Sequence, residues 1–100
     1  MPQVASVGIL VADVVAYPVS GYPERGVCVH VQRMELHVGG CASNTGLALA
    51  KLGIETTVIG KVGDDPFGDF LVAELKRHGV RTEGIRRTRE AGTSSTMVMV

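Results

Sequence analysis

The feature that most constrains the fold is an almost unbroken apolar run, rich in valine, at residues 4–12. Asp13 ends the run, and a loop marked by prolines and glycines follows. A strand without alternation of apolar and polar residues is typical of a parallel sheet, because both faces of such a sheet are buried. The sequence therefore predicts one strand at residues 4–12 in the centre of a parallel sheet, with Asp13 at its end.

Helical and strand-like segments alternate after residue 39. Apolar residues between 47 and 52 predict a short helix that begins at Ser43 or Asn44 and ends at Gly53. Residues 56–60 form the next short apolar run, which is typical of a strand in the same sheet.

A second helix is predicted after Asp65, because Asp65 is a good N-cap residue and Pro66 suits the first helical position. This helix ends at Gly79. Residues 84–88 predict a third core strand, and residues 96–100 a fourth strand whose sheet the pattern leaves open. The order of strands and helices predicts an open α/β sheet with right-handed crossovers.

Residues 27–38 show a different pattern, a strict alternation of apolar and polar side chains. The phase slips by one residue at Gln32 and Arg33, where no Gly, Pro or Asn is present to make a tight turn. One extra residue in a continuous strand, a β-bulge, explains the slip. We therefore expect a half-exposed ribbon outside the main sheet.

Charge and composition exclude several classes of function. The 100 residues include ten basic and ten acidic ones and only 4% aromatic ones, so we expect no nucleic-acid partner. The first 20 residues contain no Lys or Arg, and Asp13 interrupts the only long apolar stretch. We therefore expect no signal peptide, no membrane partner and a cytoplasmic location. Two cysteines are too few for a disulfide scaffold.

A metal site is not expected either. Cys28, His30, His37 and Cys41 fall within a short stretch, but along a strand Cys28 and His37 lie about 30 Å apart. A tetrahedral zinc site needs all of its ligands around one point. The sequence also lacks the P-loop motif, the dinucleotide fingerprint after the first strand and the serine nucleophile motif, which disfavours a nucleotide-binding Rossmann protein.

Asp13 and residues 39–44 remain as candidates for a binding site. Open α/β sheets bind ligands beyond the carboxyl ends of their strands, where a carboxylate can accept hydrogen bonds from sugar hydroxyls. Gly39 and Gly40 would let backbone N–H groups approach a ligand closely, and Asn44 offers both a donor and an acceptor. The alternative is a turn and an N-cap without a ligand.

The segment GGCASNTGLALAKLG, residues 39–53, followed by Gly60, resembles the N-terminal signature of the ribokinase family, the PfkB-type carbohydrate kinases. Residues 62–71 are similar to the start of that family's second helix, and residues 79–85 to its helix-to-strand connection. The resemblance extends in order over nearly the whole chain.

The resemblance implies that residues 1–100 are the N-terminal part of one ribokinase-like, Rossmann-like α/β domain. A small β-sheet lid would comprise residues of about 15–38 and 94–100. It also implies ATP and Mg²⁺ as cofactors of the full-length enzyme, a small sugar as its substrate, and a homodimer joined through the lid as one option.

The resemblance assigns roles to individual residues. Asp13 and Asn44 would hydrogen-bond the sugar hydroxyls, and Gly39 and Gly40 would bring backbone against the substrate. Cys41 stands where ribokinases proper carry Lys, which argues against ribose itself as the substrate.

Phosphoryl transfer needs a base for the hydroxyl proton and donors for the γ-phosphate, and the family supplies both through a late Gly-Ala-Gly-Asp-type motif. Gly63 and Asp64 lead into a helix cap and are interpreted as a structural turn. We therefore expect no catalytic base, no ATP-binding residue and no metal ligand in this chain. It is predicted to be the sugar-binding part of an ATP-dependent carbohydrate kinase, inactive alone. The alternative is a non-catalytic sugar-binding module with half of the kinase fold.

Overall fold

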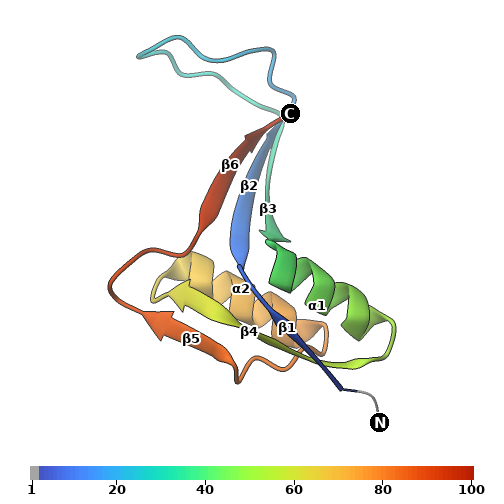
Figure 1. Ribbon diagram of the computed structural model, residues 1–100. Helices are drawn as coiled ribbons and strands as arrows, with labels where there is room; N and C mark the ends of the chain where they lie inside the picture. The colour runs from blue at the N-terminus through green and yellow to red at the C-terminus, as the bar shows by residue number, and fades with distance from the viewer. Residues whose placement is uncertain (1–2) are drawn as a thin grey trace.

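The computed structural model describes residues 3–100, so Met1 and Pro2, which the domain prediction includes, lie outside the described residues. Within this range the chain forms six strands and two helices, arranged as two three-stranded sheets (Figure 1). In chain order they are β1 (Gln3–Val7), β2 (Val11–Tyr17), β3 (Arg33–Gly39), α1 (Cys41–Lys51), β4 (Glu55–Gly63), α2 (Pro66–Arg77), β5 (Ile85–Thr88) and β6 (Ser95–Met99).

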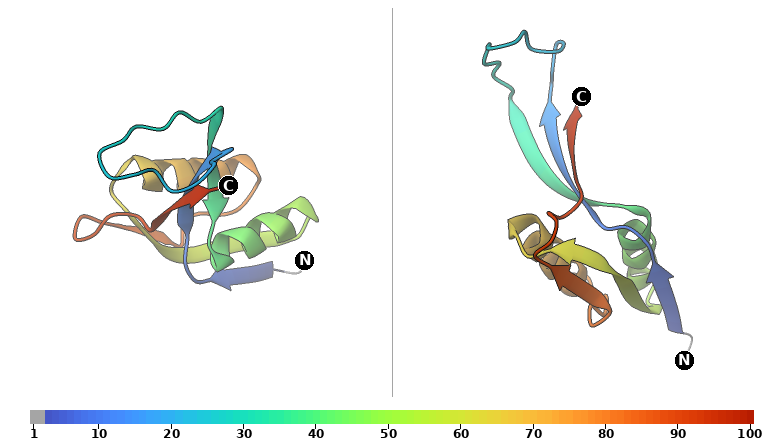
Figure 2. Two further views of the ribbon diagram at one scale, coloured as in Figure 1. Left: turned by 90° about the horizontal axis from the view of Figure 1, so that it is seen from above. Right: turned by 60° about the vertical axis from the view of Figure 1, so that its left-hand side comes forward.

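The first sheet has the strand order β1-β4-β5, and both neighbouring pairs are parallel. The two helices lie on the same face of this sheet, and the opposite face is bare (Figure 2, left panel). The structure therefore confirms the predicted α/β fold with a parallel sheet. Neither helix is long and apolar enough to cross a membrane, among the residues that the structure describes.

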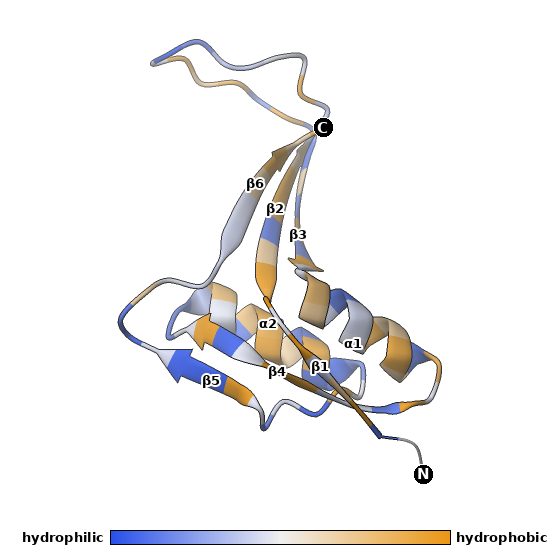
Figure 3. Cartoon of the chain, viewed as in Figure 1, coloured by the Kyte–Doolittle hydropathy of each residue, from blue (hydrophilic) through white to orange (hydrophobic). Residues whose placement is uncertain are grey.

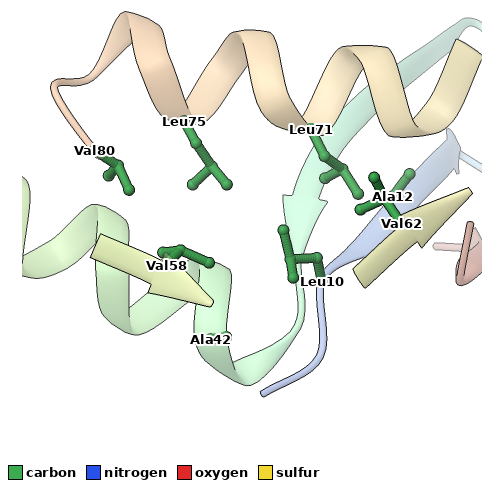
Figure 4. Packing of buried hydrophobic residues seen from close by; sticks show 8 residues of the cluster. All are labelled: Leu10, Ala12, Ala42, Val58, Val62, Leu71, Leu75 and Val80. Atoms are coloured by element: carbon green, nitrogen blue, oxygen red, sulfur yellow. The ribbon is translucent and has the colours of Figure 1, made fainter. Parts of the chain in front are cut away.

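The hydrophobic core lies between the parallel sheet and the helices. Leu71 and Leu75 of α2 are one turn apart and fully buried, and they face Val58 and Val62 of β4 (Figure 4). Burying side chains of this size contributes about 1.5–3 kcal/mol each. The rest of the core cluster is Leu10, Ala12, Ala42 and Val80.

The second sheet has the order β3-β2-β6, with β2 antiparallel to β3 and parallel to β6. It projects away from the helices, and the loop of residues 18–32 extends from its far end (Figures 1 and 2). β2 is mostly hydrophobic and is interrupted by a hydrophilic band (Figure 3). One face carries Ala16 with its register partners Met34 and Met99, and the other carries Asp13.

The prediction of a single strand at residues 4–12 is wrong. The run contains β1 and the start of β2, which belong to different sheets, with a break at residues 8–10. At this break the Ile9 carbonyl accepts a hydrogen bond from the Ala42 N–H at the start of α1 (3.2 Å), so it does not continue the ladder. A continuous apolar run indicates burial but not a change of sheet. Asp13 therefore lies inside β2 and not at the end of a core strand.

Residues 27–38 are strand only in their second half. β3 begins at Arg33 and lies outside the parallel sheet, as predicted, but residues 27–32 form no strand, so the bulge predicted at Gln32 and Arg33 is wrong. β2 ends opposite Arg33, and Pro18 follows it without an N–H for a ladder. Residues 27–32 have no neighbouring strand to pair with. They therefore form no strand, although their apolar and polar side chains alternate.

The helix α1 begins earlier than predicted. Gly40 is its N-cap with a φ of 90°, so Ser43 and Asn44 lie within the first turn and not before it. Its predicted end at Gly53 is confirmed, and this residue has a φ of 82°, which favours glycine. The helix predicted after Asp65 and the strand predicted at residues 84–88 are also confirmed. The strand predicted near the end of the chain belongs to the small sheet.

Candidate functional site

Asp13 lies in the middle of β2 with its side chain partly exposed. Its register partners are His37 on β3 and Thr96 on β6, so three polar side chains stand in a row across one face of the small sheet. The sequence predicted Asp13 as a binding residue on the assumption that it ends a core strand, whereas it lies inside a strand of the small sheet.

Gly39 makes room for the carboxylate of Asp13. It is the last residue of β3 and is buried, and a Cβ on it would lie 2.9 Å from Cγ of Asp13. A side chain at this position would have to displace the carboxylate, because Cβ atoms do not approach other atoms so closely. The missing side chain therefore allows the Asp13 carboxylate to lie against the backbone that leads into α1.

Gly40 joins β3, the break at residues 8–10 and the start of α1. A Cβ on it would lie 2.5 Å from the Ile9 carbonyl oxygen, and its positive φ is one that other residues rarely adopt. No side chain caps α1, so the partial positive charge of the helix N-terminus is next to Gly39 and the Asp13 carboxylate.

Asn44 lies in the first turn of α1, where its backbone N–H donates to the Gly40 carbonyl (2.9 Å). Its side chain is exposed. The structure thus brings Asp13, Gly39 and Gly40 together at one junction and places Asn44 one helical turn away.

Sequence reasoning missed a polar network on the face that carries Asp13. Glu35 accepts a hydrogen bond from Nε2 of His37 (2.8 Å), and its other oxygen lies 3.2 Å from Nε of Arg33. The Arg33 guanidinium lies 4.3 Å from the centroid of the Tyr17 ring. The pKa of Glu35 is lowered by hydrogen bonding from Tyr17 and then from His37. Alternation along β3 places these side chains on one face, but only the strand register, which the sequence does not give, shows that Asp13 shares it.

A second polar cluster ties the segment before β6 to the start of α2. Asp65 accepts hydrogen bonds from the Thr93 hydroxyl (2.6 Å), the Thr93 N–H (2.8 Å) and the Gly68 N–H (2.8 Å). These three donors, with the Thr93 hydroxyl first, lower the pKa of Asp65. The Thr93 hydroxyl also accepts from the Gly63 N–H (2.8 Å). The predicted N-cap is confirmed, and the cluster has a structural role in holding β6.

No group of three or more His, Cys, Asp or Glu side chains within residues 3–100 is placed to hold a metal ion. Cys28 lies in the loop, His37 on β3 and Cys41 on α1, and both thiols are free and exposed. The residues present therefore do not fit a Mg²⁺ site, and we assign no reaction step through a metal to them.

Two hollows lie at the loop of residues 18–32. One, of about 320 Å³, is lined by residues of this loop alone, and the other, of about 160 Å³, lies between the loop and the small sheet. Pro18, Val19 and Val29 are among the residues that line them. None of the four predicted site residues lines either hollow.

Comparison with known proteins gives a consistent result. A family model described as pfkB family carbohydrate kinase matches residues 1–100. The uncharacterized sugar kinase PH1459 of Pyrococcus horikoshii is 33% identical over 98 residues, which is 98% of this chain and 30% of that protein. Its crystal structure with ATP superimposes with a TM-score of 0.75 over 92% of this chain and 28% of that chain.

The mouse (Mus musculus) ribokinase is 31% identical over 97% of this chain and 30% of its own length. The fold also matches the Arabidopsis thaliana ribokinase complexed with ribose and ATP, with a TM-score of 0.85, 24% identity and coverage of 98% of this chain and 32% of that chain. The chain spans about 30% of the length of the curated relatives PH1459 and mouse ribokinase.

Proposed function

This chain belongs to the pfkB family of carbohydrate kinases, and from that premise we propose that it is the sugar-binding N-terminal part of an ATP-dependent kinase. The full-length enzyme transfers the γ-phosphoryl group to a hydroxyl of a small sugar or sugar-like substrate.

The observation that supports this function is the seating of the Asp13 carboxylate against Gly39 at the start of α1. A carboxylate only accepts hydrogen bonds, and sugar hydroxyls can donate to both of its oxygens. The backbone of Gly39 and Gly40 lies against the substrate, and Asn44 adds a donor and an acceptor from the first turn of α1. In this proposal these four residues orient the sugar, and they carry no proton-transfer step.

In this proposal the lid over the sugar comprises residues of about 15–38 and 94–100, which include most of the small sheet. A lid excludes water, which strengthens the polar contacts made to the bound substrate. The face opposite Asp13 is apolar, with Met34 and Met97 62% and 77% exposed. We propose this face as the contact between two copies of the protein in a homodimer.

The catalytic base and the ATP site belong to the part of the enzyme that lies outside this chain. ATP, when bound there, supplies the phosphoryl group and Mg²⁺ neutralises its charge. Residues 3–100 hold the sugar and place its hydroxyl. The 100-residue chain by itself is therefore inactive.

The test is an ADP-release assay of the full-length protein with ATP, Mg²⁺ and a panel of neutral pentoses, hexoses and sugar acids, with the 100-residue chain assayed in parallel. We expect turnover of at least one sugar by the full-length protein and none by the shorter chain. Sugar binding without turnover by the full-length protein would indicate the alternative, a non-catalytic sugar-binding module. Turnover by the pure 100-residue chain would overturn the assignment of the base and ATP site to the remainder.

A further inference from the structure

His37 stands directly opposite Asp13 across the β2–β3 ladder, and their side chains share one face of the small sheet. The diagonal neighbour of Asp13 on this face is Gly39, which has no side chain. A ligand that contacts the Asp13 carboxylate therefore has only Gly39 and His37 beside it on β3. The side chain of His37 is 54% exposed, so its ring is open to such a ligand.

Glu35 fixes the orientation of the His37 ring. The two residues are two apart on β3, so they share a face, and Nε2 of His37 lies 2.8 Å from a carboxylate oxygen of Glu35. Glu35 is anchored from its other side by Arg33, which in turn lies over the Tyr17 ring.

The charge of Glu35 determines which ring nitrogen of His37 carries the proton. Hydrogen bonding from Tyr17 and His37 lowers the pKa of Glu35, so the group is a carboxylate at neutral pH and can only accept. Nε2 of His37 must then be the donor in this pair. In the neutral imidazole the other nitrogen, Nδ1, is left as an acceptor.

We propose that His37 is a second substrate-contacting residue, whose Nδ1 accepts a hydrogen bond from the sugar hydroxyl next to the one that donates to Asp13. This inference rests on the proposed function, in which Asp13 holds the sugar. Two acceptors side by side on adjacent strands select a substrate with two neighbouring hydroxyls that both donate. Glu35 is the positioning residue for this contact.

Substitutions of His37 in the full-length protein separate a substrate contact from a structural role. His37→Leu removes both ring nitrogens, His37→Asn keeps a polar atom near the place of Nδ1, and His37→Gln keeps one near the place of Nε2. His30→Leu is the matched control, because His30 is exposed in the loop at the far end of the small sheet. The readouts are the KM for the best sugar of the panel, the KM for ATP and a melting curve of each variant.

We expect His37→Leu to raise the sugar KM about 3- to 10-fold and to leave the ATP KM unchanged, because one neutral hydrogen bond is lost. His37→Asn should retain most of the affinity for the sugar. His37→Gln should be as weak as His37→Leu, and the control His30→Leu should behave as the wild type. An unchanged sugar KM in His37→Leu, or rescue by Gln and not by Asn, overturns the contact. If His37→Leu does not fold, the comparison of Asn with Gln decides.

Asp13→Ala, measured in the same series, distinguishes failure of this inference from failure of the proposed function. If Asp13→Ala weakens sugar binding and His37→Leu does not, only the His37 contact is wrong. If neither substitution changes the sugar KM, or if no sugar is turned over, the proposed function fails and the His37 contact with it.

Discussion

At the scale of single residues, the contact between Asp13 and Gly39 determines the geometry of the candidate site. Both residues could be selected from the sequence as candidates for the binding site. Asp13 follows an apolar run, and Gly39 belongs to a family signature. Their contact could not be predicted, because it depends on the diagonal register of β2 against β3. Without this register, the sequence offers His37 only as a candidate metal ligand and not as a neighbour of Asp13.

Gly39→Ala in the full-length protein should raise the sugar KM by about 10-fold or more, because the added Cβ displaces the Asp13 carboxylate. The ATP KM should stay near that of the wild type. Gly21→Ala is the control, since no atom lies within 4 Å of a Cβ at that loop position. Steady-state kinetics for both substrates checks the prediction. Normal sugar affinity in a folded Gly39→Ala protein would show that the carboxylate position does not matter.

At the scale of elements, the sequence predicted best where two local signals agreed. The helix α2 has an aspartate N-cap, a proline at its first position and an apolar stripe, and it forms where these signals place it. Residues 4–12 and 27–38 had only a hydropathy pattern. A hydropathy pattern indicates which side chains are buried. The change of sheet at residues 8–10 and the lack of a neighbouring strand for residues 27–32 depend on the tertiary structure, which the pattern does not give.

The N-cap of α2 makes a prediction about pH. The pKa of Asp65 is lowered by hydrogen bonds from the Thr93 hydroxyl, the Thr93 N–H and the Gly68 N–H. A lowered pKa in the folded state means that the charged form stabilises the fold. This contribution is fully present above the unfolded pKa, about 3.9, and is lost as the pH falls through the lower folded value.

We therefore expect Asp65→Asn to lower the Tm of the full-length protein by a few degrees at pH 7 and to reduce the loss of stability between about pH 5 and 2. Thermal unfolding across this pH range, compared with the wild type, measures both effects. Asp64→Asn, at the neighbouring exposed carboxylate, is the control. An acid-induced loss of stability equal to that of the wild type would rule out the charge of Asp65 as its source.

At the scale of the whole molecule, the parallel sheet is covered on one face only. On the bare face, Val7 is 69% exposed, and its register partner across β1 and β4 is Ile59, which is 39% exposed. Lys61 and Arg86 are register partners further along the same face. Parallel sheets in folded domains are buried on both faces, so we expect the remainder of the full-length protein to cover this one.

The double substitution Val7→Ser, Ile59→Thr should make the 100-residue chain less prone to aggregate but should destabilise the full-length protein. In the 100-residue chain it should reduce binding of a hydrophobic dye and aggregation, because it removes exposed apolar area. In the full-length protein it should lower the free energy of unfolding by about 2–5 kcal/mol, because the same side chains are then buried. Val27→Ser, in the exposed loop, serves as the control. Unchanged stability of the full-length protein would mean that this face remains bare.

In the proposed function, this segment binds the sugar and the rest of the enzyme binds the nucleotide. The most direct test is the steady-state kinetics of full-length Asp13→Ala with the sugar and ATP varied separately. We expect a fall of roughly 10- to 150-fold in kcat/KM for the sugar, because one charge-assisted hydrogen bond is lost. The ATP KM should be unchanged, and the effect of Asp13→Asn should be milder. A folded Asp13→Ala enzyme with normal sugar affinity, or an equal rise of both KM values, would contradict it.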